Sequence, residues 1–398
     1  MFTATSTYFF LLFILVWGYC GYLLVLLIFS ALNPRNGKAP KETTGSPSIA
    51  VIIPCYNEEA LVQKKVENLR ALDYEAGKAE VYFVNGLSTD ATGPRLRAFI
   101  EGTAGWHCIE SGKAGKIHQL NHLLSTSRPS AEILVFTDMD AMLEPGALKG
   151  IAEEFASNER IAVVGANISP DTTMSIEESL WQDQNLFRIM ESSVYTSSIV
   201  VAPCYAVKAS FFDQFPEDCV ADDIYVAFKA NSEGMRTAYV ESIKGTEVRC
   251  PTSTAEFFRH KFRKGNAYLI ELFRFLYRLP HMPGWWKIIY LTKLLQFAVI
   301  PWLLPYFLLS TISFAMSGRG QLQIAGFGMG FLFLAFLITS AGVSRCRAAY
   351  ARRGNMKKKR RDILVPFIVS NLIMIIVGLS FPFYKQSSIY AKIGKNAS

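Results

Sequence analysis

Apolar residues gather in four long runs near the two ends of the chain. The first run spans residues 8–32, and three more span 288–316, 322–343 and 363–384. A helix needs about 20 mostly apolar residues to cross a bilayer. Each run therefore predicts a membrane-spanning helix, and the more polar stretch between the first two runs is long enough for one large domain.

Short apolar runs alternate with segments of helical spacing along this polar stretch. The short runs predict buried strands, and the alternation indicates an α/β fold whose sheet is largely parallel, with helices on both faces. Asn57 lies where the first helix would begin, and it is a plausible N-cap for a helix that ends at Leu69. The predicted strands are 48–53, 80–84, 107–109, 132–136, 161–167 and 239–240.

The pattern divides the chain into four regions. Residues 1–45 contain the first span and a linker, and residues 46–254 form the α/β domain. Residues 255–287 are rich in Phe, Leu, Arg and Lys, which is typical of amphipathic helices on a membrane surface. Residues 288–398 contain the other three spans, with a basic loop at 344–362.

Basic residues predict the orientation of the spans. Arg35, Lys38 and Lys41 follow the first run, and positive residues favour the cytoplasmic side, so the N-terminus is predicted outside and the α/β domain in the cytoplasm. The loop 344–362 carries nine Lys and Arg against one acid, and this +8 equals the net charge of the whole chain. The basic character therefore indicates membrane topology and anionic lipids. Nucleic acid is not a predicted partner, because no recognition fold accompanies the charge.

Cysteine and histidine spacing indicates neither a zinc site nor a disulfide framework. The seven Cys residues are scattered along the chain and show no CxxC spacing. His118 and His122 are one helical turn apart, but no acid accompanies them in an HExxH pattern. We interpret both histidines as surface or packing residues.

Two aspartates follow the predicted strand at 132–136. Asp138 and Asp140 fall at the carboxyl end of this buried strand, where open α/β sheets bind ligands. Strand alternation sends both side chains to the same side, and two such carboxylates can hold Mg²⁺ against a diphosphate. The alternative interpretation is an Asp-rich turn that simply ends the strand.

Several short motifs occur in one order, each at a predicted strand end or helix start. They are Pro54–Glu59 (PCYNEE), Ser88–Asp90, Lys116 with Leu120 and Asn121, Asp138–Asp140 and Asp222–Asp223. This ordered set resembles the membrane-bound family 2 glycosyltransferases, which include bacterial exopolysaccharide, cellulose and hyaluronan synthases. The resemblance covers roughly residues 48–265. It implies a GT-A fold, Rossmann-like with a mostly parallel sheet, flanked by transmembrane helices.

The resemblance also implies roles for individual residues. A nucleotide-sugar donor is expected, with Tyr56 and Glu58 lining the nucleoside pocket and Lys116 reaching the nucleotide end of the donor. Lys116 is alternatively a solvated lysine at a helix start. Asp140 is the predicted ligand of Mg²⁺ or Mn²⁺, with Asp138 on the metal or on the nucleotide, because the departing diphosphate needs positive charge.

Asp223 is the predicted catalytic base. An acceptor hydroxyl must lose its proton as it attacks the sugar, and a positioned carboxylate can take that proton. The family resemblance implies inversion through one direct displacement. Asp222 occupies a position where relatives often carry Glu, and we expect it to contact the substrate; its alternative role is a helix N-cap.

Two stretches depart from the family pattern. Asn85 and Gly86 stand where relatives carry an acidic pair, so the uridine preference common in the family, which implies a UDP-sugar, is left open. Processive synthases carry Gln-x-x-Arg-Trp further on. This chain offers Lys261, or Arg259 or Arg263 by a shifted alignment, as the cation for diphosphate, and Phe262 as the aromatic for an acceptor sugar. Alternatively, the stretch only anchors an interfacial helix through snorkelling cations.

Together these features predict an inverting, metal-dependent glycosyltransferase in a bacterial inner membrane, with several spans and a cytoplasmic catalytic domain. Its acceptor at the bilayer is either a growing polysaccharide or a lipid-linked sugar. Four spans are few for a wide channel, so a polymer exporter would need an accessory partner or a homo-oligomer. The alternative is a catalytically degenerate nucleotide-binding regulator, which the altered Asn85 and Gly86 favour. A transporter is disfavoured because the spans lack internal charges.

Overall fold

The computed structural model describes residues 4–32, 45–352, 364–384 and 386. The chain forms two compact units, one made of Met1–Pro34 with Gly284–Tyr384 and the other of Arg35–Pro283 with Lys385–Ser398. The described part of the first unit consists of apolar helices, and the second contains the sheet. Each unit is described by itself.

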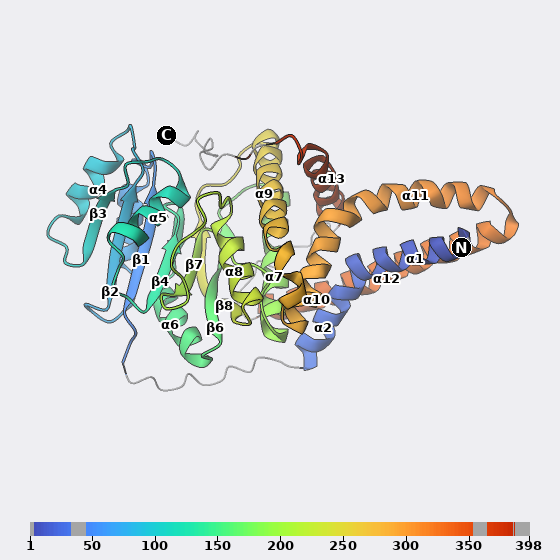
Figure 1. Cartoon of the computed structure of the whole chain (residues 1–398), viewed down its shortest axis with the longest axis horizontal. Coiled ribbons are helices and arrows are strands. Elements are labelled where there is room, and N and C mark those ends of the chain that lie inside the picture. Colours follow the sequence, from blue (N-terminus) through green and yellow to red (C-terminus); the bar gives the residue numbers. More distant parts are fainter. Residues whose placement is uncertain (1–3, 33–44, 353–363, 385, 387–398) are drawn as a thin grey trace. The chain divides into compact units, whose positions relative to one another are not determined.

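A mixed eight-stranded sheet forms the centre of the second unit, in the order β3-β2-β1-β4-β7-β6-β8-β5 (Figure 1). Only β7, which runs against β4 and β6, and β5, which runs against β8, are antiparallel to their neighbours. The prediction of a largely parallel sheet is therefore confirmed. The strands are β1 (Ile49–Cys55), β2 (Ala79–Asn85), β3 (Trp106–Glu110), β4 (Ile133–Thr137), β5 (Ala141–Leu143), β6 (Ile161–Pro170), β7 (Cys204–Lys208) and β8 (Arg236–Glu247).

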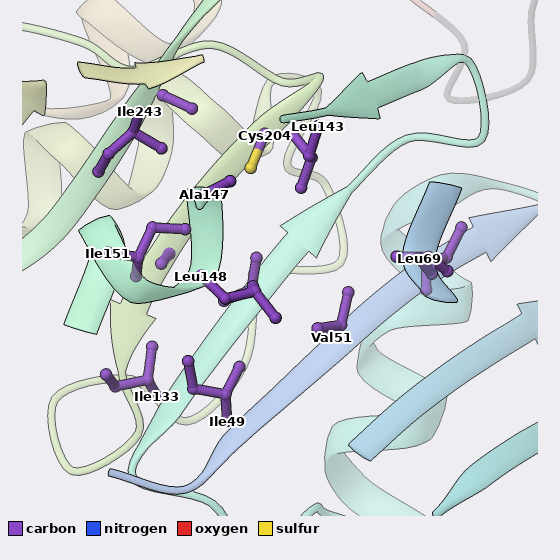
Figure 2. Packing of buried hydrophobic residues seen from close by; sticks show 14 of the residues in the cluster. Ile49, Val51, Leu69, Ile133, Leu143, Ala147, Leu148, Ile151, Cys204 and Ile243 are labelled. Atoms are coloured by element: carbon purple, nitrogen blue, oxygen red, sulfur yellow. The ribbon is translucent and has the colours of Figure 1, made fainter. Parts of the chain in front are cut away.

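Helices cover both faces of this sheet because alternate strand residues point to opposite sides. Val51 and Ile53 of β1 pack in one apolar cluster with α3, α4 and α6, whereas Ala50 and Ile52 pack in another with α5 and α8. Figure 2 shows side chains of α6 and of the strands in the first cluster. The helices of this unit are α3 (Val62–Arg70), α4 (Thr92–Ile100), α5 (Lys116–Thr126), α6 (Ala147–Ser157), α7 (Ser175–Val194), α8 (Asp222–Ser232) and α9 (Thr254–Arg274).

The helix after β1 begins later than predicted, so the N-cap role of Asn57 is wrong. Helix α3 starts at Val62, and Asn57 has a left-handed backbone with φ of 52°. Its Oδ1 accepts a hydrogen bond from the backbone N–H of Thr89 at 2.8 Å. Asn tolerates this conformation and bonds neighbouring backbone in turns as readily as at helix starts, so it links two loops here.

The first unit contains three helical stretches that are long and apolar enough to cross a membrane: Ala4–Ser30, Gly284–Met316 and Arg319–Ala349. Three of the predicted spans fall on these stretches. The fourth overlaps α13, which has 17 residues, so its spanning role stays a prediction. The helices are α1 (Ala4–Val16), α2 (Tyr22–Leu32), α10 (Gly284–Leu294), α11 (Ile300–Met316), α12 (Arg319–Arg352) and α13 (Leu364–Ser380).

Helix α12 continues into the predicted basic loop at 344–362, and residues 353–362 of that loop lie outside the described residues. Two polar side chains of the apolar unit donate hydrogen bonds to backbone carbonyls, which satisfies them without water. A π-helical turn joins α1 to α2, and the Gln296 side chain donates to the carbonyl oxygen of Gly18 in this turn at 2.7 Å. The hydroxyl of Tyr8 donates to the Ala325 carbonyl at 3.2 Å.

Candidate active site

Charged side chains meet where β4 ends and where α5 and α8 begin. The Nζ of Lys116 lies 2.8 Å from Oδ1 of Asp138 and 2.9 Å from Oδ2 of Asp222. The hydroxyl of Tyr205 on β7 donates to the same Asp222 oxygen at 2.8 Å. Lys116 is therefore an ion-paired residue and not a solvated lysine, and it joins two motifs that lie far apart in the sequence.

Burial removes water from around the carboxylates of Asp138 and Asp223 and raises their pKa values. Burial raises the pKa of Asp138 above its ordinary value, although Lys116 opposes the shift. Burial and the adjacent Asp222 raise the pKa of Asp223 to about 6, against the lowering effects of Lys116 and Lys264. The N-cap position of α8 is Ala221, and no side chain caps it, so the capping alternative for Asp222 is wrong.

Arg249, which the sequence analysis did not single out, connects the first motif with Asp140. Its Nη1 and Nη2 atoms donate to the two carboxylate oxygens of Glu58, each at 2.9 Å, and its Nε donates to Oδ2 of Asp140 at 3.0 Å. This forked geometry is the strong, orienting mode of arginine. Arg249 follows β8 and lies 191 residues from Glu58, so no local pattern could have indicated the contact.

Glu247 at the end of β8 belongs to the same acidic region. Burial raises its pKa to about 7, Lys264 lowers it, and Asp140 and Asp138 raise it further. Neither Glu247 nor Lys264 belongs to a motif that is recognisable in the sequence. The Lys264 ammonium also lies 5.0 Å from the centre of the Trp181 ring.

The donor chemistry of the site fits a divalent cation. Among the described residues, no three or more His, Cys, Asp or Glu side chains group as a complete protein cage for a metal. Mg²⁺ needs no such cage, because one or two carboxylates suffice when substrate phosphates supply further ligands. Asp138 and Asp140 offer two carboxylates, each with one oxygen bonded to a basic side chain.

A buried amine supports the loop that carries these aspartates. Lys65 on α3 is fully buried, and its Nζ donates to the Thr137 hydroxyl at 3.1 Å and to the Ala141 carbonyl at 2.6 Å. These two partners bracket Asp138–Asp140. Burial lowers the pKa of Lys65 to about 8, so the fold tolerates a costly charge to hold both ends of the loop.

We expect the difference in melting temperature between the wild type and Lys65→Met to depend on pH, because the buried Lys65 ammonium destabilises the folded chain where it is charged. The folded chain releases the Lys65 proton at about pH 8, below the ordinary value of 10.5, so the unfolded chain binds more protons between these values. The stability of the wild type should therefore rise, relative to Lys65→Met, from about pH 8 to about pH 10.5. Thermal melts of both proteins in detergent measure the gap, and a gap independent of pH would contradict the assignment.

Asn85 at the end of β2 lies in a hydrogen-bonded network. Its Nδ2 donates to Oε2 of Glu110 at 2.7 Å, and its Oδ1 accepts from the Ser88 hydroxyl at 2.5 Å. Glu110 also pairs with Arg97 at 2.8 Å. Because a carboxylate only accepts hydrogen bonds, the Asn85 nitrogen must face Glu110. The amide is thus matched to its neighbours in a way that an aspartate would not be.

Asn85→Asp should lower stability and change nucleotide affinity and preference. The new carboxylate would face Glu110, replacing a hydrogen bond with repulsion that costs about 1–3 kcal/mol. Thermal melts and competition binding of UDP and GDP measure both effects. Adding Glu110→Gln restores a donor opposite the carboxylate and should recover most of the stability. Unchanged nucleotide affinity and preference in Asn85→Asp would rule out a role for this position in base recognition.

The predicted acceptor stretch lies on α9. Lys261 forms an ion pair with the buried Glu177 of α7, with Nζ 2.7 Å from Oε2, and burial lowers its pKa. Arg259 is exposed, and Phe262 is half-buried. The structure thus ties Lys261 to α7, and Tyr56 of the first motif is half-buried near the end of β1. The roles of these four residues stay predictions.

Two family profiles match this sequence. The profile described as Glycosyl transferase family 2 matches residues 50–215, and Glycosyl transferase family group 2 matches residues 133–343, more than half of the chain. This chain belongs to the family 2 glycosyltransferases. The matched region includes all of the motifs from Asp138 to Phe262, together with α10, α11 and much of α12.

Relatives of this family 2 chain include synthases and transferases. It is 27% identical over 224 residues to cellulose synthase 2 of Novacetimonas hansenii, covering 50% of this chain and 13% of that protein. It is 25% identical over 263 residues to an N-acetylglucosaminyltransferase of Rhizobium leguminosarum bv. viciae, covering 61% and 60%. The chain thus spans less than two thirds of either relative.

A solved structure confirms the fold. The mannosyltransferase PcManGT from Pyrobaculum calidifontis, determined in complex with GDP-Man and Mn²⁺, has a TM-score of 0.66 to this chain at 21% identity. The similarity covers 94% of this chain and 100% of PcManGT. The predicted GT-A fold, an α/β domain accompanied by apolar helices, is therefore confirmed for this family 2 member.

Proposed function

We propose that this chain is an inverting, metal-dependent glycosyltransferase that moves a sugar from a nucleotide-sugar donor to an acceptor at a membrane. The observation that carries the proposal is the ion-pair bridge from Asp138 through Lys116 to Asp222. It brings the predicted metal loop and the predicted base, Asp223, into one cluster. A donor phosphate and an acceptor hydroxyl could therefore meet there.

Asp138 and Asp140 would hold Mg²⁺ or Mn²⁺, and the cation would stabilise negative charge on the departing diphosphate. Lys116 adds a fixed positive charge beside Asp138, and Arg249 orients the carboxylate of Asp140. Preoriented charges of this kind stabilise a developing anion without reorganising during the reaction. Lys65 holds the loop that carries Asp138 and Asp140 through its hydrogen bonds to Thr137 and Ala141.

Asp223 would accept the proton of the acceptor hydroxyl while that oxygen attacks the anomeric carbon. A base works best when its pKa is close to the working pH. The pKa of Asp223, raised to about 6, leaves it mostly ionised near neutrality and a stronger base than an ordinary aspartate. One direct displacement of this kind inverts the anomeric configuration.

Two donor classes follow from the relatives. The family resemblance favours a UDP-sugar, whereas PcManGT was crystallised with GDP-Man. Asn85 in its pairing with Glu110 differs from the acidic pair that accompanies uridine preference, so both nucleotides belong in the test. The acceptor is proposed to be a polysaccharide or a lipid-linked sugar, since three stretches of the chain are able to cross a membrane.

A donor screen tests the proposal. Membranes containing the protein are supplied with UDP- and GDP-sugars, Mn²⁺ and a lipid extract, and released nucleotide is measured. The matched control is the same membrane with Asp223→Asn, which should release nucleotide only at background rates. Release from the wild type with one donor supports the proposal. Nucleotide binding without release for any donor would instead favour the membrane regulator.

A further inference from the structure

Leu87, in the loop after β2, has an unusual backbone. Among the described residues, Asn57 and Leu87 are the non-glycine residues with positive φ, at 52° and 58°. Asn visits the left-handed region readily, whereas a leucine is strained there because its Cβ crowds the backbone. Strain of this kind persists only where the surroundings hold it, and it often marks a functional position.

The surroundings do hold this loop. The backbone N–H of Asn57 donates to the Ser88 hydroxyl at 2.9 Å, and that hydroxyl donates to Asn85. The backbone N–H of Gly86 donates to the carbonyl of Cys55 at 2.9 Å. Hydrogen bonds on both sides of Leu87 therefore fix its backbone conformation. The intrinsic preference of leucine does not determine it.

The Leu87 side chain is not buried in exchange for this strain. Leu87 is 53% exposed, although it is a large apolar residue within a strained turn. Gln119 fills the space beside Gly86, where an added Cβ would lie 2.6 Å from its Nε2. That nitrogen donates to the carbonyls of Cys55 and Val84 at 2.6 and 2.7 Å. The inner side of the loop is thus occupied, and the leucine is left at the surface.

The position of Leu87 identifies what could cover it. It follows Asn85 by two residues at the carboxyl end of β2, the edge where α/β sheets bind ligands. The loop is bonded to the one that carries Tyr56 and Glu58, the predicted nucleoside residues. A nucleobase has an apolar face and a polar edge, so an apolar side chain and an amide side by side suit both.

We propose that Leu87 is a specificity-supporting contact of the donor site, packing its apolar side chain against the face of the donor nucleobase while Asn85 lies nearer the polar edge. This inference rests on the proposed function, since it requires a nucleotide donor. Burial of the exposed leucine side chain against a base would offset the free energy of the backbone strain. This offset would arise only in the nucleotide complex.

Substitutions at Leu87 that change the backbone preference, the apolar surface or neither separate the two contributions. Leu87→Asn and Leu87→Gly suit the left-handed backbone but lack the apolar surface, whereas Leu87→Met keeps apolar surface and strain. Binding of UDP and GDP with Mn²⁺ is measured by calorimetry on the full chain in detergent, and melting temperatures are measured without nucleotide. Leu276→Asn, at another exposed leucine, is the control for losing apolar surface.

Leu87→Asn and Leu87→Gly should melt at higher temperature than the wild type yet bind nucleotide roughly tenfold more weakly or worse, because a buried leucine side chain is lost from the complex. Leu87→Met and Leu276→Asn should bind within about threefold of the wild type, a difference well below that of losing the buried leucine. Leu87→Ala keeps the strained backbone but lacks most of the apolar surface, so it should bind as weakly as Leu87→Asn while melting no higher than the wild type. A role of the strained backbone alone predicts wild-type affinity for this variant.

Other outcomes overturn the inference. Equal affinity of the wild type and Leu87→Asn would show that no base covers the leucine. Weak binding by Leu87→Met, as weak as that of Leu87→Asn, would show that apolar contact is not the cause. Absence of binding of either nucleotide to the wild type would defeat the proposed function itself, and the inference with it, which is a result distinct from the other two.

Discussion

Asp223→Asn is expected to lower kcat for sugar transfer by about 10²–10⁴-fold while leaving the donor Kd nearly unchanged, because an amide cannot take the acceptor proton. The substitution keeps the size of the side chain and its place at the start of α8. Initial rates with saturating donor and acceptor give kcat, and calorimetry with the nucleotide gives Kd. Loss of donor binding would mean that Asp223 holds the donor and is not the base.

The control for this variant is Asp213→Asn, which makes the same chemical change at an exposed site. It should keep wild-type turnover and melting temperature. If both variants lose activity equally, the loss reflects handling of the protein in detergent and not the chemistry of Asp223. If neither loses activity, another group accepts the proton.

The same residue predicts the acid limb of the pH–rate profile. With a pKa of about 6, Asp223 becomes protonated below that pH, so kcat should fall on acidification. The sign for stability is opposite: between the ordinary value of 3.8 and about 6 the folded chain binds more protons than the unfolded chain, so the contribution of Asp223 to stability falls as pH rises. The raised pKa therefore makes Asp223 a stronger base and lowers the stability of the folded chain near neutral pH.

Asp140→Asn is expected to lower kcat/KM by about 10²-fold or more and to weaken Mn²⁺ binding in the presence of nucleotide, because a charged ligand of the cation becomes neutral. Turnover over a Mn²⁺ titration, together with Mn²⁺ binding followed by electron paramagnetic resonance, measures both. Asp73→Asn, at an exposed position, is the matched control. Unchanged turnover in Asp140→Asn would refute the metal role.

Arg249 provides a second control for this prediction. Asp140→Asn also weakens the Arg249 contact, so part of its effect could come from a misplaced arginine. Arg249→Gln removes that contact but keeps the carboxylate, and it should retain Mn²⁺ binding. If Arg249→Gln loses Mn²⁺ binding as completely as Asp140→Asn, orientation by the arginine explains the loss, and direct ligation by Asp140 does not.

The sheet was predictable where side-chain periodicity is strong. Residues of β1 alternate between two apolar clusters, so its run of apolar residues predicts a strand buried on both faces. Strand β5 has three residues, too few to show a period. Strand β7 lies beyond the apolar run that ends at Val201, and its pairing with β4 and β6 comes from tertiary contacts that local sequence does not contain.

Asn57 and Arg249 show two limits of reading a site from sequence. Asn57 has a residue type that suits helix starts and turns equally, so its chemistry was recognised while its geometry was not. Arg249 contacts Asp140 from 109 residues away, and an isolated arginine after a strand carries no local signal. Motif residues such as Lys116 and Asp138 were predictable because strand ends and helix starts place them on one edge of the sheet, whereas Arg249 belongs to no motif and was not.

Strand β7 also determines how far apart two parts of the candidate site lie. The carbonyl oxygen of Pro203, just before this strand, accepts the Thr137 hydroxyl at 2.9 Å and the Asp138 backbone N–H at 3.2 Å, while Tyr205, two residues on, donates to Asp222. On the proposed assignment, one short strand therefore contacts both the loop that would bind the departing diphosphate and the carboxylate next to the proposed base. The distance between these two parts of the site is then set by β7. Acceptors of different length would then extend away from the catalytic cluster without changing this distance. The length of an acceptor would therefore be controlled outside the cluster.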